Sequence, residues 1–446
     1  FLNSVFAFIQ SKTELLRKNS FLLSNIDYII LFFVVLTYFV SLFENTNAIA
    51  AVALFVPILV SLKFIITKGE KIELEKCNFY LLIYLLICFI SNFTSSMIPQ
   101  SIYGFSKTLM YFGFYFALCQ FLKNNKHHIS LLFAVIAVCV GFEGIIGISQ
   151  NIIRVENLAT WQDVSYLNPE DVLSRVYGTL KPYNPNLLAG FMIAGISCLI
   201  WCSCSAFTKK QYKTSAVVFL FFLLSSFTIF LTGSRAVYIS LFTIFLGIIA
   251  ASFQIVFNDL NTDKYKLIWK RFLAVFIFGF LAFMALNHKI LQRLMSIFLL
   301  RGDSSASFRM NVYSSAVQMF QDNWLFGIGV GNKVFREIYG LYMMSGFDAL
   351  SCYCIFLEMA VESGIFALIA YLMFIGTLLS SGIKCFINSK NFNYKILLFV
   401  SIISIIAVMV HGFFDTIYFR PQVQFIFWTM AAVLTVLTRE EKTAEQ

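Results

Sequence analysis

Long apolar segments recur along the chain from residue 26 almost to its end, and short polar stretches separate them. A helix needs about 20 apolar residues to cross the roughly 30 Å hydrocarbon core of a bilayer, and each segment is close to that length. We therefore predict a single all-α polytopic membrane domain over 1–446 with about twelve transmembrane helices. The predicted spans are 26–43, 48–66, 79–98, 102–122, 129–149, 186–207, 214–232, 236–256, 268–287, 355–380, 393–413 and 421–438.

The composition fits this class of protein. Hydrophobic residues make up 59% of the 446 residues and charged residues only 13%, which leaves too few charges to cover a soluble surface. The chain begins at Phe1 without a recognisable cleavable signal, so we expect the first helix to act as its own anchor. The 10 cysteines lack CxxC pairs and histidine partners at metal spacing. We interpret them as small hydrophobic residues and expect no metal and no other cofactor.

Basic residues gather in alternate connecting segments. Because cytoplasmic loops carry an excess of Lys and Arg, this alternation places both termini in the cytoplasm. The net charge of +10 then reflects topology, and we expect no nucleic-acid partner. The basic loops contain Lys12, Arg17 and Lys18; Lys63, Lys68, Lys71 and Lys76; Lys123 and Lys126; Lys209, Lys210 and Lys213; Lys264, Lys266, Lys270 and Arg271; and Lys384, Lys390 and Lys395.

Two long segments, 150–185 and 288–354, then face outward, and the second is expected to form a large, partly helical extracytoplasmic cap. Both are rich in basic residues although long outer loops need none, so a pocket for an anionic ligand is the physical use we expect. These residues are Arg154, Arg175 and Lys181 in the first segment and Lys289, Arg293, Arg301, Arg309, Lys333 and Arg336 in the second.

The stretch "RGDSSASFRMNVYSSAVQMFQDNWLFGIGVGN" at 301–332 combines polar and apolar positions. From Ser307 the apolar residues recur at helical spacing, which predicts an amphipathic helix on the membrane surface. Arg309 in its first turns can face a phosphate or, alternatively, a lipid headgroup. Gly327, Gly329 and Gly331 do not match a dinucleotide fingerprint and indicate sharp turns or a close approach of backbone to a ligand.

Ionisable residues inside or beside the apolar spans are costly and therefore indicate function. In the predicted topology they share the outer half of the membrane, which indicates one site near the outer leaflet. Lys107 and Glu143 lie at similar depth and can form a pair. The others are Arg235, Glu358, Glu362, His411, Asp415 and Arg420.

Five stretches together resemble the O-antigen ligase and polymerase superfamily (WaaL-like, with a Wzy_C-type domain). They are "YGTLKPYNPNLLAGF" (177–191), "LTGSRAVYISLF" (231–242), "SSASFRMNVYSSAVQMFQDNWLFGIGVGNKVF" (304–335), "FLEMAVESGIFALIAYL" (356–372) and "HGFFDTIYFRPQ" (411–422). The resemblance covers about 175–425, and several motifs look like the cyanobacterial IctB branch, which carries a bicarbonate-transporter label.

The resemblance implies a metal-independent glycosyltransferase in a bacterial inner membrane. Its donor would be a polyprenyl-diphosphate-linked glycan, its acceptor a lipid or another glycan, and its partner the lipid bilayer. Arg235 in "GSRA" and Arg309 in "SFRMN" match two diphosphate-binding arginines of the family. A polysaccharide polymerase would use the same site, whereas a small-anion transporter would need polar groups near the membrane midplane.

The histidine that the family's ligases carry in the outer loop is absent from 289–354, so either Glu358, Asp348 or His411 accepts the proton, or the ligase chemistry is absent. We expect catalytic roles for Arg235, Arg309, Glu358 and His411. For substrate binding we expect Arg301, Arg175, Lys181, Asn186 and Arg420. Aromatic residues placed to stack on sugar rings are Trp161, Tyr177, Tyr183 and Tyr353.

Overall fold

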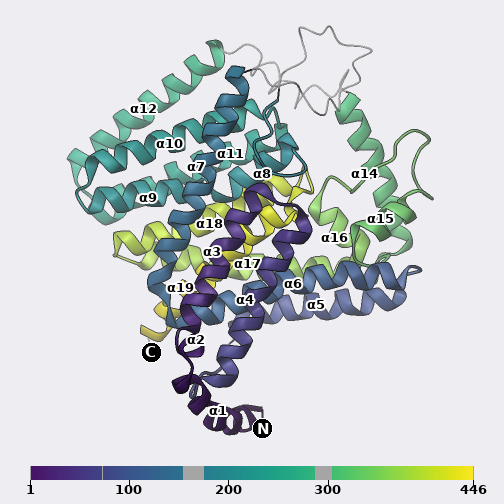
Figure 1. The fold of residues 1–446 in the computed structure, drawn as a ribbon. Coiled ribbons are helices and arrows are strands. Elements are labelled where there is room, and N and C mark those ends of the chain that lie inside the picture. Colours follow the sequence, from purple (N-terminus) through teal and green to yellow (C-terminus); the bar gives the residue numbers. More distant parts are fainter. Residues whose placement is uncertain (1, 73, 154–174, 287–303, 445–446) are drawn as a thin grey trace.

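The apolar runs form helices that satisfy their own backbone hydrogen bonds, as a chain must inside a bilayer. The computed structural model describes residues 2–72, 74–153, 175–286 and 304–444, and within these ranges every regular element is a helix (Figure 1). The first half contains α1 (Leu2–Asn19), α2 (Phe21–Ser24), α3 (Ile26–Phe43), α4 (Thr46–Ile66), α5 (Lys76–Thr94), α6 (Ile98–Asn124), the 3-10 turn η1 (Lys126–His128) and α7 (Ile129–Ile153).

The second half begins with α8 (Pro185–Gly195), α9 (Ser197–Thr208), α10 (Tyr212–Leu231), α11 (Arg235–Gln254), the π-helical turn η4 (Ile255–Leu260) and α12 (Asp263–Leu286). It ends with α14 (Ser304–Asp322), α15 (Asn332–Tyr339), α16 (Ile355–Ser363), α17 (Ile365–Asn388), α18 (Phe392–Gly412), the 3-10 turn η5 (Ile417–Phe419) and α19 (Pro421–Ala444). Both chain ends lie at the lower side of the molecule in Figure 1.

Ten helical segments in the described ranges are long and apolar enough to cross a membrane. The twelve predicted spans all coincide with helices, but α6 and α12 are not among these ten. α6 carries Gln100, Ser106 and Lys107, and α12 starts with a basic turn, which lowers their hydropathy. The membrane-protein class is confirmed, whereas the count of twelve stays a prediction.

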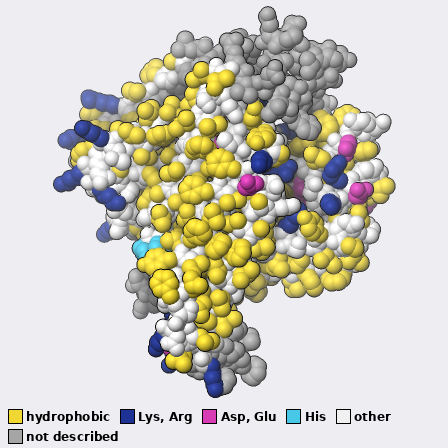
Figure 2. Space-filling view, viewed as in Figure 1, with side chains coloured by type: hydrophobic (Ala, Val, Ile, Leu, Met, Phe, Trp, Pro, Cys, Tyr) yellow, Lys and Arg dark blue, Asp and Glu magenta, His cyan; other side chains and the backbone are white. Residues whose placement is uncertain are grey.

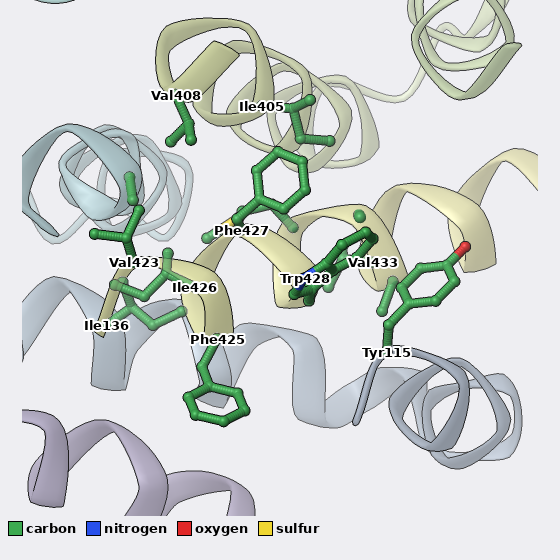
Figure 3. Packing of buried hydrophobic residues seen from close by; sticks show 14 of the residues in the cluster. Tyr115, Ile136, Ile405, Val408, Val423, Phe425, Ile426, Phe427, Trp428 and Val433 are labelled. Atoms are coloured by element: carbon green, nitrogen blue, oxygen red, sulfur yellow. The ribbon is translucent and has the colours of Figure 1, made fainter. Parts of the chain in front are cut away.

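The core of the bundle is built around α19. Residues 421–438 are all buried, and the ring of Trp428 packs edge-on against Phe112 with 4.7 Å between centroids. Figure 3 shows Trp428 between Tyr115 and Phe427, with Phe425 and Ile426 filling the neighbouring layer. This segment has the lowest hydropathy of the ten and includes the buried polar residues Gln422, Gln424, Thr429 and Thr435, so its central position follows from packing and not from an apolar sequence alone.

The predicted span 355–380 is wrong at its start, because the chain breaks at Gly364. That residue has φ +82°, and it separates the nine-residue helix α16 from the spanning helix α17. The break is paired with the segment before α15: Ile328 N donates to Val361 O (2.9 Å) and Ile365 N to Trp324 O (2.9 Å). A β-carbon on Gly364 would overlap the Leu325 carbonyl oxygen. The cap is defined here as α14–α16 with their connections, residues 304–363.

The glycines of "GIGVGN" form the sharp turns that were predicted, and the segments that they approach closely belong to the chain itself. Gly327, Gly329 and Gly331 all have positive φ, a conformation that glycine adopts at little cost. A β-carbon on Gly327 would overlap the Glu362 carbonyl oxygen. A β-carbon on Gly329 would overlap the Ser95 hydroxyl, and one on Gly331 would lie 2.9 Å from the Gly104 Cα, so these two glycines hold the cap against the bundle.

The amphipathic helix begins at Ser304 as α14, but its apolar face does not have the surface position that we predicted. Val312, Ala316 and Met319 are buried in a small core that they share with Val334 and Phe335 of α15. Helical periodicity shows that one face is apolar, but it cannot tell a membrane from a neighbouring helix. α14 is therefore part of the cap.

Replacing Gly364 by alanine is expected to destabilise the protein by roughly 2–4 kcal/mol, since alanine disfavours positive φ and its methyl group overlaps the Leu325 carbonyl. Thermal unfolding in detergent measures the change. Gly376→Ala in the same helix is the control, because a methyl group there would meet no atom within 4 Å and alanine favours helix at that position. Equal stability of the two variants would contradict the packing at the α16–α17 break.

Candidate functional site

A cavity of about 970 Å³ lies where the cap meets α6, α8, α11 and α19. Charged side chains gather there in an otherwise hydrophobic surface, on the right side of Figure 2. Its lining includes the basic residues Lys107, Arg175, Arg235, Arg309, Lys333 and Arg420 and the acidic residues Asp348, Glu358, Glu362 and Asp415. The structure thus brings together residues that lie far apart in the sequence.

Two arginines of the cavity are joined through a polar chain. Arg175 Nη2 donates to Asn186 Oδ1 (2.6 Å), and Asn186 Nδ2 donates to Asp415 Oδ2 (3.1 Å). The same carboxylate oxygen lies 3.8 Å from Arg309 Nη2. Asp415 is 4% exposed, and its other oxygen accepts a hydrogen bond from Ile417 N (3.2 Å). Asp415 and Asn186 therefore orient Arg175 and Arg309 toward one space.

Arg175 is held by the turn between α10 and α11. Its Nε donates to the Thr232 carbonyl (2.7 Å), and the next residue, Gly233, has φ +63°. A β-carbon on Gly233 would lie 3.3 Å from the Arg175 side chain. The "TGS" turn therefore needs glycine both for its backbone conformation and for the approach of the arginine.

Arg235 is the first residue of α11, directly after Ser234 at the helix N-cap. The first backbone N–H groups of a helix have no partner within the helix, and the helix dipole favours an anion beside them. Ser234, Arg235 and Ala236, which form this helix start, all line the cavity. This is a suitable environment for phosphate oxygens.

Arg309 projects from the second turn of α14 into the same cavity. Its Nη1 donates to the Phe414 carbonyl (2.9 Å), and its guanidinium lies 5.4 Å from the centre of the Tyr353 ring. Tyr353 has φ +54°, an unusual conformation for a bulky residue, which costs about 1–3 kcal/mol and tends to occur at functional sites. We refer to Arg175, Arg235 and Arg309 as the arginine cluster.

Glu358 and Glu362 form a carboxyl pair one helical turn apart on α16, and both line the cavity. Glu358 is 3% exposed and accepts a hydrogen bond from Cys352 N (3.1 Å). Burial raises the pKa of Glu358 well above its usual range, and the neighbouring Glu362 adds to that rise. Burial also raises the pKa of Glu362 to about 8, against the opposing effect of the Gly331 N–H. Burial therefore favours the neutral form of both carboxyl groups, and a carboxylate that can accept a proton forms only as pH rises toward the raised pKa of Glu362.

These raised pKa values predict a stability that depends on pH. Between an unfolded-state pKa of 4.5 and a folded-state pKa of about 8, the folded protein binds more protons than the unfolded chain. The stabilising contribution of the pair is therefore complete below pH 4.5 and is lost as pH rises through the folded pKa. We expect the melting temperature to fall by several degrees over this window, and the fall to be smaller in Glu358→Gln/Glu362→Gln. An unchanged pH dependence in that variant would contradict the burial of the pair.

Several predicted site residues lie elsewhere. The Lys181 ammonium is 3.9 Å from a Glu44 carboxylate oxygen, and it does not line the cavity. His411 is buried at the end of α18 behind the cavity wall, and its Nε2 has no hydrogen-bond partner among the described residues. Arg301 and Trp161 lie outside the described residues.

The predicted pairing of Lys107 with Glu143 is wrong. Glu143 instead accepts hydrogen bonds from the Thr179 backbone N–H (3.1 Å) and from the Thr179 hydroxyl, while Lys107 faces the cavity. Two residues at the same depth in the membrane can point to opposite sides of their helices. The predicted depth of Lys107 and Glu143 was therefore not enough to show that they pair.

The sequence analysis missed most of the aromatic lining. Of the four aromatic residues proposed to stack on sugars, Tyr353 lines the cavity and Tyr177 and Tyr183 do not. The cavity is lined instead by tyrosines from many elements, which scattered sequence positions do not reveal: Tyr84, Tyr103, Tyr111, Tyr313, Tyr353, Tyr371 and Tyr418. Tyrosine rings with polar ends suit a ligand that is both apolar and hydroxylated.

Comparison with known proteins adds one match. The family model described as O-Antigen ligase matches residues 219–372, which supports the superfamily resemblance. The matched range includes Arg235, Arg309 and the carboxyl pair, whereas Arg175, Asn186 and Arg420 lie outside it. No curated protein matches the chain.

Proposed function

We propose that the chain is a membrane glycosyltransferase of the O-antigen ligase type. It transfers a glycan from a polyprenyl-diphosphate carrier to a lipid or glycan acceptor at the outer face of a bacterial inner membrane. The observation that carries the proposal is the arrangement of Arg175, Arg235 and Arg309 around one cavity that the carboxyl pair also lines. The family match over 219–372 supports the same type of chemistry.

The arginine cluster binds the donor diphosphate. Guanidinium groups form paired hydrogen bonds with phosphate oxygens, and the N-terminus of α11 adds backbone N–H donors. When the bond between the sugar's anomeric carbon and the diphosphate oxygen breaks, the electron pair stays on the diphosphate. Fixed cations at that position stabilise the developing charge and lower the barrier. The three arginines balance the negative charge of the departing diphosphate. The proposed reaction therefore needs neither a metal nor another cofactor.

The carboxyl pair accepts the proton of the acceptor hydroxyl. As the acceptor oxygen bonds to the anomeric carbon, its proton passes to a carboxylate of Glu358 or Glu362. This role replaces the family histidine that the chain lacks in 289–354. Asp348 is a weaker alternative, because its carboxylate is 70% exposed and lies 3.8 Å from Arg336. His411 is a weaker one too, because it stands outside the cavity lining.

The polyprenyl tail remains in the bilayer, since removing each buried CH₂ group costs about 0.8 kcal/mol. The cavity lining includes the apolar residues Ile239, Met310 and Phe414, and Met310 is 56% exposed. These residues offer an apolar path from the arginine cluster to the outside of the bundle. We propose that the tail leaves between α11 and α14.

The alternative to a glycosyltransferase is a transporter of a small anion such as bicarbonate, as the IctB label suggests. The packing of the bundle disfavours this function. A second cavity of about 280 Å³, lined by Glu75, Lys123 and Arg439, lies at the other end of α19. Between the two cavities, Trp428, Tyr115 and Phe374 are fully buried and in ring contact. A transporter instead places polar groups at the midplane. Polymerisation of a lipid-linked glycan uses the proposed site unchanged and differs only in the acceptor.

The proposed topology places both termini in the cytoplasm and the cap outside. In spheroplasts of a strain expressing a cysteine-free variant, Ser345→Cys in the cap is expected to react with an impermeant maleimide. Lys210→Cys, in the basic turn between α9 and α10, is expected to react only after permeabilisation, because basic loops stay inside. The reverse labelling pattern would contradict the topology.

The function is tested with purified protein in proteoliposomes. We expect glycan transfer from a polyprenyl-diphosphate donor to a lipid or glycan acceptor, followed by the release of polyprenyl diphosphate. Parallel liposomes are assayed for bicarbonate flux. Saturable bicarbonate flux without any release of polyprenyl diphosphate would replace the glycosyltransferase by the transporter.

A further inference from the structure

Two lysines of the cavity stand apart from the arginine cluster. Lys107 of α6 and Lys333 of α15 place their ammonium groups 4.6 Å and 5.7 Å from the centre of the same ring, that of Tyr103. All three residues line the cavity. Within the described residues, no hydrogen bond, ion pair or ring contact joins this lysine pair to the arginine cluster. The proposed donor chemistry therefore does not account for it.

The packing of α15 on α6 brings these lysines together. Val330 N donates to the Ser101 hydroxyl (2.8 Å), and a β-carbon on Gly104 would overlap the Val330 carbonyl oxygen. Gly331, two residues before Lys333, has φ +115° and packs against Gly104. The backbones that carry the two lysines are therefore in tight contact, so their convergence on one ring does not depend on a flexible loop.

The two lysines place like charges around one aromatic ring. Both lysines are exposed toward the cavity, and in the ranges that the structure describes neither has a carboxylate within ion-pair distance. The ring of Tyr103 attracts each cation through its face but cannot neutralise either. Two cations held around one ring repel each other, and an anion between them removes that repulsion.

We propose that the lysine pair, Lys107 and Lys333, is a second anion site that binds a phosphate monoester of the acceptor while the arginine cluster holds the donor diphosphate. A phosphate monoester carries nearly two negative charges at neutral pH, which two ammonium groups balance. Lysine binds phosphate as a point charge and tolerates varied orientation, whereas the planar forks of the arginines suit the fixed oxygens of a diphosphate. This proposal rests on the proposed function.

The lysine pair adjoins the carboxyl pair. Gly329 N donates to the backbone carbonyl of Glu362 (3.0 Å), and the N–H of Gly331, the residue directly before α15, lowers the pKa of the Glu362 carboxyl; α15 is the helix that carries Lys333. An acceptor held by its phosphate at the lysines therefore has its hydroxyl groups close to the carboxylate that takes the proton. In this proposal the donor and the acceptor are recognised by separate charges of the cavity that the carboxyl pair also lines.

Binding to the full-length protein in nanodiscs tests this inference. The probes are farnesyl diphosphate for the arginine cluster, and glucose 6-phosphate in solution or phosphatidic acid in the nanodisc for the lysine pair. In Lys107→Gln/Lys333→Gln we expect glucose 6-phosphate or phosphatidic acid to bind at least about tenfold more weakly, with farnesyl diphosphate binding unchanged. Lys107→Arg/Lys333→Arg keeps the charges and should retain binding, and Lys209→Gln/Lys210→Gln controls for net charge.

The two phosphate probes distinguish the source of the phosphate. Lysine-dependent binding of glucose 6-phosphate indicates a phosphorylated glycan, and lysine-dependent binding of phosphatidic acid indicates a lipid headgroup. The inference is overturned if both probes bind the glutamine variant as tightly as the unchanged protein, or if glucose competes as well as glucose 6-phosphate. Lysine-dependent phosphate binding without any farnesyl diphosphate binding would support the anion site and refute the donor role of the arginines.

Discussion

Arg235→Ala and Arg309→Ala are each expected to reduce glycan transfer by at least about 10²-fold while leaving expression intact. Both residues line the cavity in which the proposed reaction places charge on the departing diphosphate, and the loss of one fixed donor of this kind costs roughly 10²–10³ in rate. Lysine at either position should rescue poorly, since it cannot form the paired hydrogen bonds of the guanidinium. Transfer assays in proteoliposomes measure the effect.

The control is Arg336→Ala. Arg336 lies on α15 within the cap, but it does not line the cavity and pairs with the exposed Asp348. Its loss should leave transfer near normal. If Arg235→Ala and Arg309→Ala also transfer glycan at near-normal rates, the arginine cluster is not the donor site.

Glu358→Gln and Glu362→Gln are expected to lower the rate of transfer by roughly 10²–10⁴, the usual contribution of a general base. In the unchanged protein the rate should rise with pH as Glu362 ionises, because only a carboxylate accepts a proton. The raised pKa of Glu362, about 8, places this rise near neutral to mildly alkaline pH. Each glutamine variant should lose this dependence on pH along with most of its activity.

The matched control is Glu337→Gln. Glu337 is exposed on α15 and does not line the cavity. It should keep both the rate and the pH profile. Retention of the pH-dependent rise by Glu358→Gln and Glu362→Gln would assign the proton transfer to another group.

The helices were predictable because crossing a bilayer imposes long apolar runs. The break at Gly364 was not, since the run 355–380 is apolar on both sides of it and hydropathy does not register a backbone turn. The role of α16 follows from that break, because it places the carboxyl pair on a short helix at the cavity wall. The charges of Glu358 and Glu362 therefore indicated the site from the sequence, but they did not reveal that a separate short helix, α16, carries them.

The arginines were predictable from their position and from the motifs around them, but their coupling was not. Asn186 and Asp415 connect Arg175 to Arg309 across a separation in sequence that no local pattern records. The same reasoning from position and charge selected Lys181, whose ammonium pairs with Glu44 outside the cavity. Charge indicates the side of the membrane, whereas packing decides which charges meet.

The most direct test of the central claim is an experimental structure of the protein with a bound polyprenyl diphosphate. We predict density for the diphosphate within hydrogen-bonding distance of both Arg235 and Arg309, with the tail leaving between α11 and α14 into the bilayer. A diphosphate bound outside this cavity, or an empty cavity at a saturating concentration of the lipid, would contradict the assignment of the donor site.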